Sequence, residues 1–350
     1  MLKTVTISSV VALALGAKIS PEDHHTYTDF ESIVKHVNQP GSTWTAAIPS
    51  RFGNHTVAAQ KRALGTILPG EEGYSGPEVF RTKFQEFATI PDAFDVRTNW
   101  PECAPITGHV RDQSDCGSCW AFGSTEAFND RYCIKTGDAS TLFSPEDTVS
   151  CCSGFKCAGS QGCNGGQPSG AWKWFTTDGV VSGGDYADLG KGTSCQPYSM
   201  MSCAHHVTPP PGMIDCATIS PEYSTPKCSS KCETNYAVSF ANDKHKASSS
   251  YGISGVQNIQ QELMEKGTVS VAMSVYEDFE AYSGGVYVHK TGQYLGGHAI
   301  KMIGWGVDNG TPYWICTNSW NDSWGEKGTF RILRGKNECG IEQSVVAGDA

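Results

Sequence analysis

Val110-Arg-Asp-Gln-Ser-Asp-Cys-Gly-Ser-Cys-Trp-Ala-Phe122 joins a glutamine, a short Gly/Ser turn and a cysteine that is followed at once by large apolar side chains. From Cys119 to Arg131 the chain has no proline and one glycine, which predicts a helix. Ser118 stands where a hydroxyl N-cap is favoured. The Cys119 thiol would then lie on the first helical turn, where free N–H groups and the helix dipole favour a thiolate. The stretch therefore predicts a nucleophilic cysteine.

The overall composition is that of an ordinary globular protein. Hydrophobic residues make up 39% of the 350 residues and charged residues 18%, enough apolar material for one large domain or two. The formal net charge of -10 argues against nucleic acid or an anionic membrane as the partner.

Cysteine usage indicates an oxidising compartment, because fifteen cysteines are far more than a reduced cytosolic enzyme carries. The alternative is a zinc site among Cys151, Cys152, Cys157 and Cys163. Their spacing does not repeat paired Cys-x-x-Cys knuckles, so we predict disulfides and neither a metal nor another cofactor. The odd count leaves at least one thiol unpaired.

The N-terminal part divides into two segments. Residues 1–17 resemble a secretory signal, with Lys3, an apolar run too short for a membrane anchor, and small residues before a cleavage site. Residues 18–89 contain no cysteine. Within them an amphipathic helix is predicted from the apolar positions Phe30, Ile33, Val34 and Val37. This segment is either a linker, a small extra domain or a removable segment.

Helical and strand signals separate along the rest of the chain. Helices are predicted at 144–147 onward, 168–178 and 258–266, from caps, proline at the first turn and terminal glycines. Strands are predicted at 269–275, 298–303, 313–317 and 329–333, which are rich in β-branched and aromatic residues. The fold class is therefore α+β, with two lobes that meet at a cleft.

Cys116-Gly-Ser-Cys-Trp120 matches the local signature of papain-family cysteine proteases, and the chain resembles the cathepsin B-like members of that family from about Ile90 to Gly348. The resemblance implies a papain-like fold, with a helical lobe, a β-barrel-like lobe and the active site between them. It implies a signal peptide (1–17), an inhibitory propeptide (18–89) and a mature peptidase domain (90–350).

The motifs of that family supply partners for Cys119. Gly296-Gly-His-Ala-Ile places His298 at a strand entry, as the base and acid of a Cys–His pair. Tyr313-Trp-Ile-Cys-Thr-Asn-Ser-Trp320 supplies Asn318 to orient the imidazole, with Trp320 shielding that hydrogen bond. Gln113 matches the glutamine of the oxyanion hole. The resemblance implies a cysteine-type endopeptidase that forms an acyl-enzyme.

An insertion separates Cys119 from His298 by 179 residues, more than in most papain-like chains. Cys203–Cys216 resembles the occluding loop of cathepsin B, which implies that His205 and His206 block one end of the cleft, bind a C-terminal carboxylate and add peptidyl-dipeptidase activity. Asp112 stands at the position of the acidic anchor of the loop. The paired histidines are otherwise an exposed loop or a weak metal site.

This loop departs from the pattern. The usual arginine before Cys216 is absent, and Ser323 replaces its aspartate partner. We therefore expect a loop that opens readily and favours endopeptidase cleavage.

Substrate contacts also follow from the resemblance. The pocket for the second residue before the scissile bond is expected to include Pro168, Ala272, Ala299 and Ser344. Ser344 replaces a glutamate that is common in cathepsin B, which predicts a preference for apolar or aromatic residues over arginine. Gly165 and Gly166 are expected to approach the substrate backbone closely.

The resemblance implies six disulfides, a pairing that the sequence alone does not select. They are Cys103–Cys133, Cys116–Cys163, Cys151–Cys228, Cys152–Cys157, Cys195–Cys232 and Cys203–Cys216. Cys119, Cys316 and Cys339 remain unpaired, and Cys316 is expected to be a small buried hydrophobic side chain.

Glycosylation is predicted at the sequons of Asn54 and Asn309; Asn321 lies three residues past Asn318, and no glycan is assigned to it. The resemblance implies a monomer in the lysosome or outside the cell. Its implied partners are protein and peptide substrates, its own propeptide and cystatin-type inhibitors.

Two other classes compete with a protease. A protease-fold binding protein without catalysis normally lacks one of the four active-site residues, and all four are present. A purely structural disulfide-rich protein does not explain why an odd cysteine stands in this motif.

Overall fold

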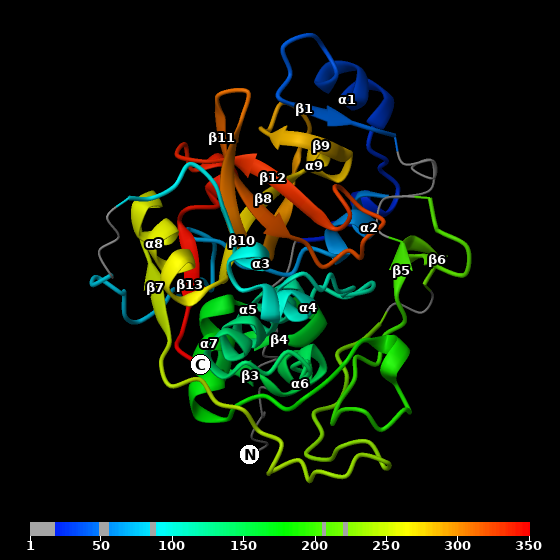
Figure 1. Cartoon of the computed structure of the whole chain (residues 1–350). Coiled ribbons are helices and arrows are strands. Elements are labelled where there is room, and N and C mark those ends of the chain that lie inside the picture. The colour runs from blue at the N-terminus through cyan, green and yellow to red at the C-terminus, as the bar shows by residue number, and fades with distance from the viewer. Residues whose placement is uncertain (1–17, 49–55, 85–88, 205–207, 220–222) are drawn as a thin grey trace, which may run out of the picture.

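The computed structural model describes residues 18–48, 56–84, 89–204, 208–219 and 223–350. A lobe built around a large sheet lies above a lobe of helices (Figure 1). This is the predicted α+β arrangement. The proposed signal peptide, 1–17, lies outside the described residues. Within them, no helix combines the length and the apolar character that crossing a membrane requires.

Five of the helices, α1, α5, α6, α7 and α8, form where the sequence predicts them, whereas α2, α3, α4 and α9 were not predicted. Their bounds are α1 (Phe30–Val37), α2 (Val57–Arg62), α3 (Val96–Asn99), α4 (Ala104–Thr107), α5 (Cys119–Thr136), α6 (Pro145–Cys151), α7 (Pro168–Thr177), α8 (Val256–Lys266) and α9 (Glu277–Glu280). The α1 helix buries Phe30, Ile33 and Val37, the face expected from the sequence.

Two helix starts show how local capping works. The Ser144 hydroxyl accepts a hydrogen bond from the Asp147 N–H at 3.0 Å, so α6 is capped as predicted. The expected cap at Ser118 is wrong. The Ser118 hydroxyl lies 3.1 Å from the Tyr198 hydroxyl and makes no capping hydrogen bond. The Ser118 hydroxyl instead forms a hydrogen bond with Tyr198, a buried side chain of the helical lobe.

The main sheet combines strands from both ends of the chain. The strands of the described residues are β1 (Trp44–Ala46), β2 (Phe94–Asp95), β3 (Ser153–Gly154), β4 (Ser160–Gln161), β5 (Cys203–Ala204), β6 (Ile214–Asp215), β7 (Tyr251–Ile253), β8 (Val269–Tyr276), β9 (Tyr282–Tyr287), β10 (Tyr294–Asp308), β11 (Thr311–Thr317), β12 (Thr329–Leu333) and β13 (Ser344–Ala347). Strands β3 and β4 pair with each other in one small sheet, and β5 and β6 in another. The order in the main sheet is β1-β9-β12-β11-β10-β8-β13-β7, and β2 also pairs with β10.

Residues 18–89, called the N-terminal segment from here on, contribute to this sheet, since β1 pairs antiparallel with β9. Trp44 is buried, its ring centroid lies 4.9 Å from that of Tyr287, and its indole N–H donates to the Val288 carbonyl at 2.8 Å. A large aromatic side chain thus fixes the segment to the upper lobe.

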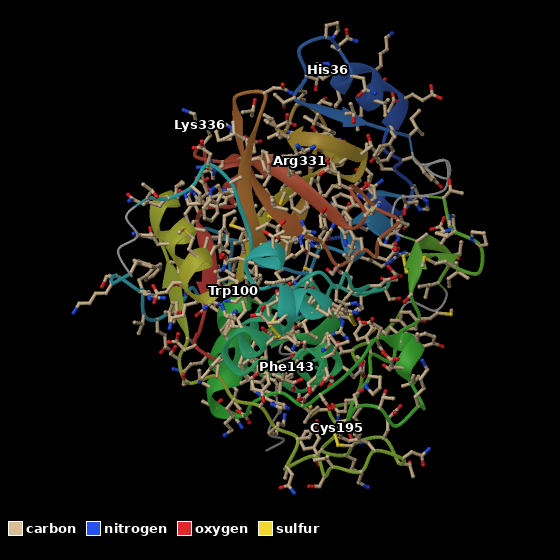
Figure 2. The ribbon with its side chains drawn as sticks, viewed as in Figure 1. His36, Trp100, Phe143, Cys195, Arg331 and Lys336 are labelled. Carbon is tan, nitrogen blue, oxygen red and sulfur yellow. A yellow bond between two sulfur atoms is a disulfide. The ribbon has the colours of Figure 1, made fainter. Side chains whose placement is uncertain are left out.

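The two lobes meet where α5 packs on β10. At Gly123 in α5, an added Cβ would lie 3.1 Å from the Ile300 carbonyl carbon and oxygen, so a side chain there would fit only tightly against β10. Each lobe has its own apolar core. Figure 2 shows Phe143 within the helical lobe, where its ring centroid lies 5.0 Å from that of Phe128. Residue 300 follows His298 closely, so the contact sets the distance between β10 and the start of α5.

Disulfides brace mainly the helical lobe and its long loops. All six bridges connect the cysteines in the pairs that the resemblance implies. Cys119, Cys316 and Cys339 carry free thiols. Cys316 is fully buried, and burial raises the pKa of its thiol well above the usual value. It is thus an inert core side chain, as expected.

Candidate active site

The Cys119 thiol lies at the first residue of α5 and is fully buried. Burial raises the pKa of this thiol, but the charge of His298 and a hydrogen bond to it outweigh burial, with help from Thr66 and the Ala299 backbone. The pKa of Cys119 falls from 9.0 to about 7. A thiolate is therefore accessible near neutral pH, which is what a cysteine nucleophile needs.

His298 comes from β10 and is held by the residues that follow β11. Its Nε2–H donates to Asn318 Oδ1 at 2.8 Å, because an amide oxygen can only accept. The same Oδ1 accepts from the Ser319 N–H at 2.8 Å. This leaves Nδ1 as the ring atom that can interact with Cys119. The Trp320 ring centroid lies 4.8 Å from that of the imidazole, and Trp320 is fully buried.

Gln113 is buried, and its side chain is oriented by three hydrogen bonds. Its Oε1 accepts from the Ser319 hydroxyl at 2.7 Å, which points the amide nitrogen the other way. That Nε2 donates to the Cys116 carbonyl at 2.7 Å and to the Ala63 carbonyl at 2.9 Å. A backbone carbonyl of the N-terminal segment, that of Ala63, thus occupies the Gln113 amide group.

The N-terminal segment passes directly over the thiol. Gly65 N–H donates to Cys119 Sγ at 3.4 Å, and the Thr66 hydroxyl lies 3.2 Å from the same sulfur. A Cβ added to Gly65 would lie 1.8 Å from the Gly117 carbonyl oxygen. Only glycine fits between the segment and the turn before α5.

Backbone pairing holds this segment on both sides of the site. Gly166 N–H donates to the Gly65 carbonyl at 2.7 Å, and Ile67 N–H donates to the Gly166 carbonyl at 3.3 Å. On the other side, Thr66 N–H donates to the Gly297 carbonyl at 3.0 Å. Gly166 has no room for a side chain, because its Cβ would lie 2.5 Å from the Trp120 ring. Gly165, with φ +108°, forms the turn before it.

Three of the four predicted specificity residues form one row across the sheet. Ala272 in β8 is the register partner of Ala299 in β10 and of Ser344 in β13, so the three side chains share a face. Pro168 begins α7, which packs against β8 and β13. All four residues are buried. The row itself contains no ionisable side chain.

The base of the loop at 203–216 is held by one carboxylate and one amide. Asp112 Oδ2 accepts from the Cys203 N–H at 2.9 Å and from Asn321 Nδ2 at 3.0 Å. Asn321 Nδ2 also donates to the Cys203 carbonyl at 2.6 Å. The sequence indicated the role of Asp112 but not that of Asn321, for which it indicated only a glycosylation sequon. His205 and His206 lie outside the described residues.

The two sequons predicted to carry glycans, at Asn54 and Asn309, fall in different parts of the chain. Asn309 is exposed in the turn between β10 and β11. Asn54 lies outside the described residues. Asn321 is buried, and its Nδ2 donates hydrogen bonds to Asp112 and to the Cys203 carbonyl.

The sequence model described as papain family cysteine protease matches residues 90–348. The chain belongs to the papain family of cysteine proteases. Cathepsin B-like cysteine proteinase 5 of Caenorhabditis elegans is 44% identical over 91% of this chain and 89% of its own. Cathepsin B-like cysteine proteinase 4 of the same organism is 44% identical over 99% of each chain.

Solved structures of precursors have the same fold. Procathepsin B S9 from Trypanosoma congolense superposes with a TM-score of 0.75 at 33% identity, over 91% of this chain and 97% of its own. Digestive procathepsin L 3 of Tenebrio molitor shares the fold, with a TM-score of 0.63 at 20% identity over 92% of this chain and 88% of its own. This chain is a cathepsin B-like cysteine peptidase made as a zymogen, and the alternative of a non-catalytic binding protein has no support.

The perturbed thiol generates a prediction about pH. In the intact precursor, the ultraviolet absorption of the Cys119 thiolate, taken as the difference from Cys119→Ser, should be present above pH 7 and be lost as pH falls through about 7. Burial keeps the pKa of Cys316 and of Cys339 above the usual value, so neither thiol titrates in this range.

In His298→Ala the charge that opposes burial is removed, so the midpoint should move above pH 9.0, the ordinary value for this thiol. An unchanged midpoint would contradict the assignment of His298 as the stabilising group.

Proposed function

We propose that Cys119, His298, Asn318 and Gln113 carry out peptide hydrolysis once residues 18–89 have been removed. The Cys119 thiolate attacks the scissile carbonyl carbon, and the oxyanion accepts hydrogen bonds from Gln113 Nε2 and the Cys119 N–H. Each such donor contributes about 3 kcal/mol in comparable sites. His298 donates its proton to the leaving amine, and water then hydrolyses the thioester. Asn318 keeps the imidazole oriented throughout, and Trp320 shields that hydrogen bond.

The observation that carries this proposal is the contact set of the N-terminal segment. Its backbone meets the thiol, the Gln113 amide and Gly166, the same groups that a substrate backbone would need. A segment in that position excludes substrate, so we infer that residues 18–89 are an inhibitory propeptide. The family match beginning at residue 90 supports a mature chain that starts near Ile90.

Compartment and partners follow from the same features. Six disulfides support passage through an oxidising compartment, with residues 1–17 as the signal and a lysosomal or extracellular destination. The exposed Asn309 is a glycan acceptor in this proposal, as is Asn54. Partners of the mature monomer are protein and peptide substrates and cystatin-type inhibitors that enter the cleft.

Gly65→Leu tests the inhibitory role. Because a side chain there would overlap the Gly117 carbonyl, the segment must lift off the thiol. We expect the purified precursor to process itself at least about tenfold faster in acid, a weakening of about 1.4 kcal/mol in propeptide docking. Glu72→Leu, at an exposed position of the same segment, is the matched control. Equal half-times for the two variants would contradict the proposal.

The uncharged row with Ser344 sets specificity in this proposal. The activated enzyme should hydrolyse a Phe–Arg fluorogenic peptide faster than an Arg–Arg peptide, because a buried arginine would meet no carboxylate. Ser344→Glu should raise the Arg–Arg to Phe–Arg ratio of kcat/KM about tenfold.

Gln343→Glu adds the same charge at the exposed neighbouring position and should leave that ratio unchanged. Equal turnover of the two peptides by the wild type would contradict the assigned pocket.

The loop at 203–216 regulates exopeptidase activity in this proposal. His205 and His206 bind the C-terminal carboxylate of some substrates and give peptidyl-dipeptidase activity. Asp112 and Asn321 hold the base, whereas the salt bridge of the family pattern lacks both partners. We therefore expect a loop that opens readily and an enzyme that works mainly as an endopeptidase.

Deletion of 203–216 should change endopeptidase kcat/KM by less than about twofold, under 0.5 kcal/mol of transition-state stabilisation, while abolishing dipeptide release. A large rise in endopeptidase activity would show that the loop normally blocks the cleft.

A further inference from the structure

Beyond the cleft, the N-terminal segment binds a second site on the peptidase domain. Arg81 N–H donates to the Gly252 carbonyl at 2.9 Å, and Gly252 N–H donates to the Val79 carbonyl at 2.8 Å. Gly252 lies in β7, the last strand of the main sheet, at the left edge in Figure 1. Residues 79–81 therefore extend the sheet at the end opposite β1. An edge strand without this partner presents unpaired backbone groups.

The side chain of Arg81 is held more specifically than its backbone. Nη1 lies 2.6 Å from Glu262 Oε2, and Nη2 lies 2.6 Å from Glu265 Oε1. The guanidinium carbon lies 5.8 Å from the centroid of the Tyr251 ring. Two carboxylates that meet the two ends of one guanidinium, beside an aromatic face, recognise arginine and not lysine.

The peptidase domain holds this pocket together without Arg81. Glu262 is fully buried, and its other oxygen, Oε1, accepts from the Tyr251 hydroxyl at 2.9 Å and from Arg131 Nη2 at 2.9 Å. Arg131 balances the charge of Glu262 when the N-terminal segment leaves. Oε2 is then left facing the position that Arg81 occupies, as a preformed acceptor.

Gly252 completes the site by having no side chain. An added Cβ would lie 2.5 Å from Pro77 Cγ and 2.7 Å from the Phe80 ring. Its φ lies outside the positive range, so the backbone itself does not require glycine. The peptidase domain thus leaves space at this edge for an apolar ring that precedes the arginine.

The second site is connected to the cleft by a continuous set of contacts. Gln167, directly before α7, donates to the Gly73 carbonyl at 3.0 Å and accepts from the Ser75 N–H at 2.6 Å. The Ser169 hydroxyl donates to the Ser75 carbonyl at 2.6 Å. Arg81 follows Thr66, which contacts the thiol, by 15 residues. One polypeptide can therefore contact the thiol and the arginine pocket together.

We propose that the edge of β7 with Glu262 and Glu265 is an exosite in the mature enzyme, which binds an extended arginine-bearing segment of protein substrates. This rests on the proposed removal of residues 18–89, which vacates the site. The substrate segment pairs with Gly252 as residues 79–81 do, places an apolar side chain over Gly252 and inserts its arginine between the two carboxylates. Such a substrate is captured at a distance from the bond that is cut.

The binding test uses mature enzyme whose Cys119 is blocked by an epoxide, so that the cleft is excluded. A labelled peptide, Ser75-Gly-Pro-Glu-Val-Phe-Arg-Thr-Lys-Phe84, should bind saturably in fluorescence anisotropy. Replacing its arginine (Arg81→Ala) should weaken binding at least about tenfold, whereas Thr82→Ala, at an exposed position, should not. Enzyme variants Glu265→Ala and Gly252→Val should each weaken binding similarly. Absence of saturable binding would overturn the proposal.

The functional test measures two substrates with active enzyme. The unlabelled peptide should slow hydrolysis of fluorescein-labelled casein but leave Phe–Arg peptide turnover unchanged. Glu265→Ala should likewise hydrolyse casein more slowly than the wild type but the Phe–Arg peptide at the same rate. Phe–Arg turnover reports the proposed peptidase activity itself, so its loss is distinguishable from loss of the exosite. If Gly252→Val yields no active enzyme, Glu265→Ala carries the test. Equal inhibition of both substrates, or of neither, would overturn the proposal.

Discussion

The interaction of Cys119 with His298 is the constraint on which the site depends, because burial alone would keep the thiol neutral. The imidazole is the main group that lowers the pKa of Cys119 to about 7, with smaller contributions from Thr66 and the Ala299 backbone. The two residues come from different lobes, so the interaction requires the close packing of α5 on β10 at Gly123. Asn318 and Trp320, which lie just after β11, then fix the imidazole.

The N-terminal segment pairs with the peptidase domain through its backbone at several places along its length. It adds β1 to one end of the main sheet, pairs with Gly166 and Gly297 over the thiol, and adds residues 79–81 to the other end. Side chains of the segment add further contacts, among them Trp44 in the upper lobe, Arg62 with Asp115, and Arg81 between two carboxylates.

Much of this was predictable from the sequence, because the family motifs fix Cys119, His298, Asn318 and Gln113 and the strong caps and alternation fix most elements. The resemblance implied the disulfide pairs, which spacing alone does not determine. Contacts between segments distant in sequence were not predictable. The Ser118 hydroxyl bonds to Tyr198 instead of capping α5, Asn321 anchors the loop at Cys203, and Arg81 meets Glu262. In each case tertiary packing brings the two partners together, so no local pattern in the sequence indicates the contact.

The most direct measurement is hydrolysis of the Phe–Arg peptide by activated protein, before and after treatment with a thiol-trapping epoxide, with mass spectrometry to locate the adduct. We expect turnover that the epoxide abolishes, one adduct on Cys119, and none on Cys316 or Cys339. Correctly processed, folded protein that shows no turnover, or turnover that survives full modification of Cys119, would contradict the role of Cys119 as the nucleophile.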